Sequence, residues 1–207
     1  QGIDISRVNF IKAPIGIQSS FLSRLLFLKK YDWMIYNTDG SIFLSTAKNN
    51  VIHFQMPFSD EGIKGLWGRL KLKSWKKGIY NSKFTQEYIE KSWPIAGEVI
   101  YPPVDTKRYA PTKKEKEIIT VGRFVLSSKV KKQDLMIQVF KELFKSGEMN
   151  GWSFNLVGGV LPGDEEFLHD LQRQSEGFPI FFYPNLPISK LTHLYERSSI
   201  YWHAMGY

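Results

Sequence analysis

The sequence predicts an α/β protein made of two Rossmann-like halves. Short apolar runs bounded by turn residues alternate with longer segments of helical period, which is the pattern of βαβ units with a parallel sheet. This alternation is interrupted by the polar, charged and proline-containing stretch 106–117, where we place a linker. We therefore expect two domains, covering residues 1–108 and 109–207.

The first half begins with "SSFLSRLLFLKK" (19–30), where serines at the start and lysines at the end favour a helix. Ser82 is placed to cap a second helix in "SKFTQEYIEKSW". The strands expected in this half are 33–38, 50–57, 78–82 and 97–105, and prolines end the second and the last of them.

The second half continues the alternation of strands and helices. The strands expected here are 118–122, 153–159, 180–184 and 200–204, and the helices are 133–145, 164–176 and 189–198. Helix 133–145 is expected to pack on a sheet through one apolar face, made of Leu135, Met136, Val139, Phe140 and Leu143.

Composition restricts the class of protein. A hydrophobic content of 43% with 23% charged residues is ordinary for a soluble globular protein, and no stretch approaches the ~18 uncharged apolar residues of a membrane span. The absence of cysteine excludes disulfides and thiolate metal sites, and it favours a cytosolic setting. We expect a cytoplasmic protein, either free or peripheral at the inner face of a membrane.

The net charge of +8 indicates an anionic partner, which can be nucleotide phosphate, anionic lipid or nucleic acid. Segment 64–77, "KGLWGRLKLKSWKK", concentrates lysine and arginine around leucines and tryptophans and holds no acid. This composition is typical of helices at membrane interfaces, and the predicted contacts are Lys71, Lys73, Trp75, Lys76 and Lys77. The alternative is a solvated face whose tryptophans pack inward.

A basic turn separates strand 118–122 from helix 133–145. In open α/β sheets, ligands bind beyond the carboxyl ends of the strands, where helix N-termini offer N–H groups to anions. Arg123 lies at such an end, and Lys131 and Lys132 precede the helix. The guanidinium suits bidentate phosphate binding, and a lysine adds a point charge. The alternative is a solvated surface loop.

The segments "TVGRF", "KKQDLMIQVFKEL" and "FNLVGG" resemble, in this order, the opening of the C-terminal domain of family-four glycosyltransferases, which have the two-Rossmann GT-B fold. The preceding "NSKFTQEYIEKSW" and "EVIYPPVDTKRY" resemble the end of the N-terminal domain of that family. The resemblance covers nearly the whole chain. It implies a retaining hexosyltransferase with a nucleotide-sugar donor, no cofactor and no metal, and with both Rossmann-like halves incomplete here.

The resemblance assigns roles to several residues. It implies that Arg123 and Lys131 bind the donor diphosphate while Gly122 allows the backbone to approach it; Lys129 and Lys132 are alternatives to Lys131. Gly158 and Gly159 either turn near the ligand or simply end a strand, and Leu186 is the expected contact of the nucleotide base, with an ordinary loop as the alternative.

His53 is the residue of the first half that the resemblance assigns to the donor sugar, as a positioning group rather than a nucleophile. A structural histidine within an apolar strand is the alternative. "YNTDGS" (36–41) resembles a loop of a mannosyltransferase-like branch, so Asp39 either faces the site or makes a turn. The other histidines have no partner at metal spacing, and no metal site is expected.

The function expected from the resemblance is transfer of a hexose from a GDP- or UDP-sugar to a hydroxyl of a glycan or lipid-linked glycan. The sequence begins without an initiating Met and ends within an apolar run, so we expect a piece of a longer protein that is itself inactive or nearly so. The alternatives from other classes are a nucleic-acid-binding module, which uses the basic and aromatic surface, and a noncatalytic membrane-surface adaptor.

Overall fold

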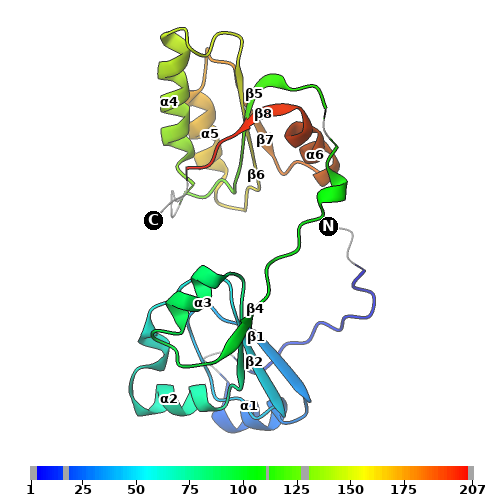
Figure 1. Cartoon of the computed structure of the whole chain (residues 1–207), viewed down its shortest axis with the longest axis vertical. Helices are drawn as coiled ribbons and strands as arrows, with labels where there is room; N and C mark the ends of the chain where they lie inside the picture. The colour runs from blue at the N-terminus through cyan, green and yellow to red at the C-terminus, as the bar shows by residue number, and fades with distance from the viewer. Residues whose placement is uncertain (1–3, 16–18, 111, 127–130, 205–207) are drawn as a thin grey trace. The chain divides into compact units, whose positions relative to one another are not determined.

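The computed structural model describes residues 4–15, 19–110, 112–126 and 131–204, and these fall into two compact units that divide between Val104 and Asp105. Each unit is a four-stranded, fully parallel sheet with helices packed on it (Figure 1). The predicted α/β fold with two Rossmann-like halves is confirmed. The units are called here the first unit, up to Val104, and the second unit, from Asp105.

The first unit has the strand order β1-β2-β3-β4. Its strands are β1 (Trp33–Asn37), β2 (Asn49–Phe54), β3 (Lys77–Tyr80) and β4 (Gly97–Val99), and its helices are α1 (Phe21–Leu28), α2 (Gly65–Lys73) and α3 (Lys83–Ile89), with a 3-10 turn, η1, at Asp60–Ile63. Ser20 and Ser82 begin α1 and α3 by accepting hydrogen bonds from Ser23 N and Thr85 N, so the predicted cap at Ser82 is confirmed.

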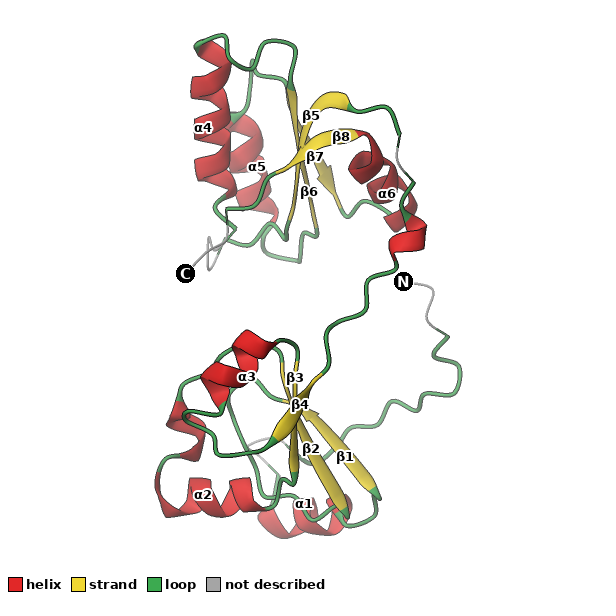
Figure 2. Cartoon of the chain, viewed as in Figure 1, coloured by secondary structure: helices red, strands yellow, loops and turns green. Residues whose placement is uncertain are grey.

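Side-chain alternation along the strands separates the two faces of this sheet. The three helices cover one face of the sheet (Figure 2). Ile52, Phe54 and Tyr80 point to that face, since they share a core with Leu28, Leu72 and Ile89 from the helices. Ile35, His53 and Ile79 have the opposite parity and lie on the other face of the sheet.

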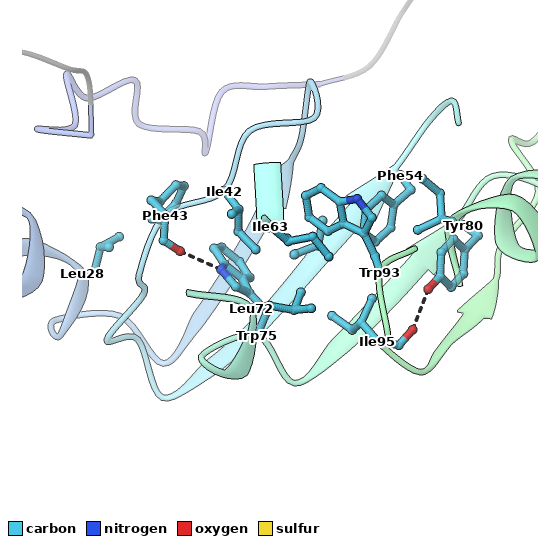
Figure 3. Close-up of a cluster of buried hydrophobic side chains, with 12 residues drawn as sticks. Leu28, Ile42, Phe43, Phe54, Ile63, Leu72, Trp75, Tyr80, Trp93 and Ile95 are labelled. Atoms are coloured by element: carbon cyan, nitrogen blue, oxygen red, sulfur yellow. Dashed lines mark hydrogen bonds between the residues drawn. The ribbon is translucent and has the colours of Figure 1, made fainter. Parts of the chain in front are cut away.

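Aromatic side chains fill the core of the first unit (Figure 3). The Phe54 ring stacks on the ring of Tyr80 with their centroids 5.2 Å apart, and Trp93 meets Phe54 edge-on. The buried polar atoms of these rings have partners: the Tyr80 hydroxyl donates to Ile95 O at 2.7 Å, and Trp75 Nε1 donates to Phe43 O at 2.8 Å. The core is therefore apolar, and the polar atoms of these buried rings are hydrogen-bonded to backbone carbonyls.

The second unit has the strand order β7-β6-β5-β8. Its strands are β5 (Glu115–Val121), β6 (Ser153–Gly158), β7 (Ile180–Pro184) and β8 (Ser198–Tyr201), and its helices are α4 (Gln133–Lys145), α5 (Glu165–Gln174) and α6 (Ile188–Arg197), with a 3-10 turn, η2, at Thr106–Arg108. Helices α4 and α5 lie on one face of the sheet and α6 lies on the other (Figure 1).

The predicted bounds of α4 and β7 are confirmed to the residue, but the predicted apolar face of α4 is partly wrong. Met136 and Phe140 are buried as expected, whereas Leu135 and Val139 are exposed and Ile137 is fully buried. The reason is Gln133, which is buried with its amide bonded to backbone carbonyls, so the positions three, four and seven residues later also face inward.

Candidate functional site

The carboxyl edge of the second unit's sheet gathers the predicted anion-binding residues. Loops leave β5, β6 and β7 at this edge, because the three strands run parallel and pair with one another. After β5 the chain stays close to β6: Gly122 N donates to Val157 O and Phe124 N donates to Gly159 O, both at 2.9 Å. Arg123 therefore sits between two residues whose backbones are fixed.

Two glycines lie at this edge, and one of them, Gly158, is required by the close approach of two backbones. A Cβ on Gly158 would lie 2.0 Å from Gly122 O, which no larger residue tolerates. A Cβ on Gly122 would lie 3.2 Å from Lys131 Cδ and 3.3 Å from Lys131 Cγ. The Lys131 side chain thus lies against Gly122, next to Arg123 in the chain.

Two polar residues that the sequence did not single out hold this edge together. The buried Gln133 donates from Nε2 to Arg123 O at 3.0 Å and to Gly122 O at 3.4 Å. Asn185, at the end of β7, donates from its backbone N to Gly158 O at 2.8 Å and accepts at Oδ1 from Val160 N at 3.1 Å. The loops after β5, β6 and β7 are therefore cross-linked by amide hydrogen bonds.

Backbone strain marks the same edge. Among the described residues, Lys132 and Asn185 are the non-glycine residues with positive φ, each at 52°. Asparagine tolerates this left-handed conformation, but lysine does not favour it. Lys132 is the residue before α4, and its strained conformation stands directly before the first N–H groups of that helix. Strain of this kind is retained where the surrounding structure imposes it and often accompanies a functional site.

The edge carries positive charge. Arg123 and Lys132 are exposed, and neither forms an ion pair with an acidic side chain within the described ranges. Lys131 is half-buried against Gly122. Lys129, the third lysine considered, lies outside the described residues. The structure thus brings Gly122, Arg123, Lys131 and Lys132 together in one unit, at the carboxyl edge of its parallel sheet and before the start of α4.

Leu186 lies on the α6 side of the sheet. It packs against the small cluster of Ile119, Val157 and Leu194, and it lines a cavity of about 190 Å³ together with Tyr183 and Lys190. The cavity therefore has an apolar wall at Leu186 and a positive charge at Lys190.

His53 is on β2 in the first unit, half-buried on the sheet face opposite the helices. It lines a pocket of about 650 Å³ whose walls are apolar at Ile35, Ile79 and Ile100 and polar at Gln55 and Asn81. Tyr101 and the two prolines that follow it also line the pocket. His53 therefore has a cavity beside it rather than the packed interior of a structural strand residue.

Asp39 makes a turn. Its Oδ1 accepts a hydrogen bond from Ser41 N at 3.0 Å, and this bonding to Ser41 lowers the pKa of the exposed Asp39 carboxyl. Gly40 follows with a φ of +101°. The turn interpretation of this Asp-Gly pair is the one that the geometry supports.

The basic aromatic segment differs from the prediction at Trp75. That side chain is only 4% exposed and its Nε1 is bonded to Phe43 O, so the expected contact between Trp75 and a membrane is wrong. Trp75 lies two residues after the end of α2 and belongs to the core of the first unit. Lys76 donates to Lys48 O, and Lys77, on β3, pairs with Glu98. In contrast, Trp67 on α2 is 72% exposed.

Within the described ranges, no group of histidine and acidic side chains is placed to hold a metal ion. His193 instead contacts Glu196, with Nδ1 3.2 Å from Oε2. In the part of the chain that the structure describes, no helix has the length and apolar character needed to cross a bilayer.

Comparison with known proteins finds similarity in structure alone. No family model matches the chain, and no curated protein matches it in sequence. A solved structure described as "Trehalose-6-phosphate from E. coli bound with UDP-2-fluoro glucose" is similar over 72% of this chain, with a TM-score of 0.53 and 12% identity. A "Glycosylation Associate Protein (Gap123) complex from Streptococcus agalactiae" aligns over 74% of this chain with a TM-score of 0.42 and 13% identity.

The first of these similarities shows a shared fold. This shared fold agrees with the observed architecture, in which two Rossmann-like units correspond to the GT-B fold class. The chain spans about half of the length of that structure, 46%. At 12% identity, the similarity extends to the fold and not to the roles of individual residues.

Proposed function

We propose that this chain belongs to a retaining glycosyltransferase that moves a hexose from a GDP- or UDP-sugar to a hydroxyl of a glycan or lipid-linked glycan. The observation that carries the proposal is the Lys131 side chain lying against Gly122, beside Arg123, at the carboxyl edge of a parallel sheet. This is where the fold binds phosphate groups. The shared fold with a structure that holds UDP-2-fluoro glucose supports a sugar-nucleotide donor.

The two cations act on the leaving group. When the bond between the anomeric carbon and the diphosphate oxygen breaks, the oxygen keeps the electron pair and negative charge grows on the diphosphate. The guanidinium of Arg123 and the ammonium of Lys131 neutralise that charge, and fixed cations stabilise it more than mobile water does. Gln133 fixes the backbone of Arg123, because Gln133 Nε2 donates a hydrogen bond to the Arg123 carbonyl oxygen. The acceptor hydroxyl oxygen forms the new bond to the anomeric carbon on the face that the diphosphate leaves, and its proton passes to the leaving diphosphate.

His53 positions the donor sugar in this proposal. Its imidazole borders the pocket of about 650 Å³, in which Gln55 and Asn81 are the polar neighbours that can meet sugar hydroxyls. Leu186 takes the nucleotide base, which suits the apolar wall of its own cavity. The diphosphate is held by side chains of the protein, without a metal or another cofactor.

Calorimetric titration of the chain with GDP, UDP and ADP tests the diphosphate site. We expect binding by at least one of them, weakened about tenfold or more by Arg123→Ala and by Lys131→Ala, since each removes a charge-assisted hydrogen bond. Arg173→Ala is the matched control, because Arg173 is exposed on α5 and pairs with Asp170. Equal affinity of the native chain and the Arg123→Ala variant would reject the assignment.

A further inference from the structure

Helices α1 and α2 leave an unusual set of apolar side chains exposed. On α2, Leu66 is 75% exposed and Trp67 72%, and Leu70 follows on the same side one turn later. On α1, Phe21, Leu22 and Leu26 are each more than half exposed. Neighbouring exposed apolar residues of this size mark an interaction surface rather than ordinary solvent contact.

The packing of α2 explains why this side faces outward. Gly68 and Leu72 form the buried side of the helix, one turn apart. A Cβ on Gly68 would lie 2.3 Å from the carbonyl carbon of Ile63, so the helix approaches the η1 turn closely there. Leu66 and Leu70 are two positions before these residues, which places them on the opposite side of the helix.

As drawn in Figure 2, both helices are at the lower end of the first unit. The short segment Ser45–Thr46 is bonded to the end of each: Thr46 Oγ1 donates to Leu25 O of α1, and Ser45 N donates to the Oγ of Ser74, the residue after α2. The exposed apolar residues of α1 and α2 therefore belong to one region of the surface, called here the α1–α2 surface.

The charged residues within helices α1 and α2 are all basic. Lys29 and Lys30 follow α1, and Arg69 and Lys73 are exposed on α2. Neither helix contains an acidic residue. The residues directly before and after each helix are not acidic either. Helix α3 differs: it also exposes aromatic rings, at Phe84 and Tyr88, but it carries Glu87 beside them and Glu90 after its end.

We propose that the α1–α2 surface docks the protein on an anionic phospholipid bilayer. Leucine and tryptophan side chains enter the interfacial region, and the flanking lysines and arginine meet lipid phosphates. The apolar part of the surface is Phe21, Leu22 and Leu26 of α1 and Leu66, Trp67 and Leu70 of α2, with the cations around them. Trp75, Lys76 and Lys77 are not part of it. This docking does not depend on the proposed sugar transfer.

Co-sedimentation of the chain with vesicles tests the proposal. We expect binding to vesicles of phosphatidylcholine with phosphatidylglycerol, and little binding to phosphatidylcholine alone. The charge variant Lys30→Glu/Arg69→Glu/Lys73→Glu is expected to lower partitioning at least about tenfold. Its control is Lys107→Glu/Lys113→Glu/Lys116→Glu, which makes the same change of net charge on exposed residues of the second unit and is expected to keep most of the binding.

The apolar contribution is tested separately. The variant Leu66→Gln/Trp67→Gln/Leu70→Gln is expected to lower partitioning about tenfold, whereas Phe84→Gln/Tyr88→Gln on α3 leaves it unchanged. Lipids brominated in the acyl chain are expected to quench the fluorescence of the native chain more than that of Trp67→Phe. Circular dichroism establishes that each variant is folded.

Three results would overturn the proposal. One is equal loss of binding in the charge variant and its second-unit control, which would indicate a general effect of net charge. Another is full binding by the apolar variant. The third is binding of single-stranded RNA with the same dependence on the α1 and α2 substitutions, which would assign the surface to nucleic acid instead. Nucleotide titration of the charge variant remains a separate measurement and tests only the sugar-transfer proposal.

Discussion

Adjacent glycines at the end of β6 have different roles. A Cβ on Gly158 would meet Gly122 O at 2.0 Å, whereas a Cβ on Gly159 would meet Arg123 Cγ and Asn185 Oδ1 at 3.8 Å, an ordinary contact distance. Neither glycine has a positive φ. Gly158 is therefore required because the backbones at the ends of β5 and β6 approach closely. The position of Gly159 tolerates a side chain.

Gly158→Ala is expected to destabilise the second unit by about 1–3 kcal/mol, because β5 and β6 must separate to admit the methyl group. Gly159→Ala is the matched control and is expected to change the free energy of unfolding by less than about 0.5 kcal/mol. Urea unfolding of both variants measures the difference. Equal stability of the two variants would mean that the strand ends adjust without cost.

A tyrosine in the second unit predicts sensitivity to alkaline pH. Burial raises the pKa of Tyr195 to about 12, with smaller contributions from Tyr201 and Tyr109. In the unfolded chain the phenol ionises near pH 10, while in the folded unit it stays protonated. The stability contributed by the neutral form is thus fully present below about pH 10 and is lost as the pH rises toward 12.

Tyr195→Phe is accordingly expected to flatten the loss of stability above about pH 10, since phenylalanine cannot ionise in either state. Tyr101→Phe, at an exposed tyrosine of the first unit, serves as the control and should leave the alkaline profile unchanged. Thermal melts across the alkaline range provide the measurement. An unchanged profile for Tyr195→Phe would show that other groups control the alkaline transition.

The start of α4 combines an element boundary with the candidate site. Lys132 holds a φ of 52°, and the residue offers no side-chain cap to the helix. Lys132→Gly is expected to stabilise the second unit by about 0.5–1 kcal/mol, because glycine adopts the left-handed conformation without the Cβ clash. Asn185→Gly is the comparison: it has the same φ but also loses the bond from Val160 N, so it should not stabilise.

The same variant decides which lysine contacts phosphate. If Lys131 binds the diphosphate, as proposed, Lys132→Gly keeps nucleotide affinity while Lys131→Ala loses it. The opposite pattern would move the assignment to Lys132. Calorimetric titration with the nucleotide that binds most tightly separates the two outcomes.

Local sequence patterns predicted the elements well, because periodicity and capping are properties of short segments. The bounds of α4 and β7 and the cap at Ser82 followed from them. The inward rotation of α4 did not, since it depends on Gln133 bonding to carbonyls ten and eleven residues earlier. Trp75 was misplaced for the same reason: its partner, Phe43 O, is 32 residues away.

The candidate site was predictable to a similar degree. The order of strand, Gly-Arg, lysine and helix predicted that Gly122, Arg123 and Lys131 would share one edge, and the structure places them there. The bonds of Asn185 to the loop after β6 could not be predicted, because they join segments 25 or more residues apart. The Tyr-Pro-Asn sequence at 183–185 gives only a turn signal.

At the scale of the whole molecule, each unit has its own apolar core. Phe54, Tyr80 and Trp93 belong to the core of the first unit, and Phe140, Phe154 and Leu171 to that of the second. Units with separate cores are able to unfold separately. Phe140 is fully buried on α4 and packs against Phe154 with ring centroids 5.5 Å apart, so it stabilises one unit only.

Phe140→Ala is therefore expected to destabilise the second unit by about 3–5 kcal/mol and to leave the first unit unchanged. Differential scanning calorimetry should then show one transition moved to lower temperature and one in place. Ile52→Ala, at a fully buried position on β2, is the reciprocal variant and should move the other transition by about 2–5 kcal/mol in free energy. If both transitions move together in either variant, the two units unfold as one cooperative body, because destabilising one core then destabilises the whole chain.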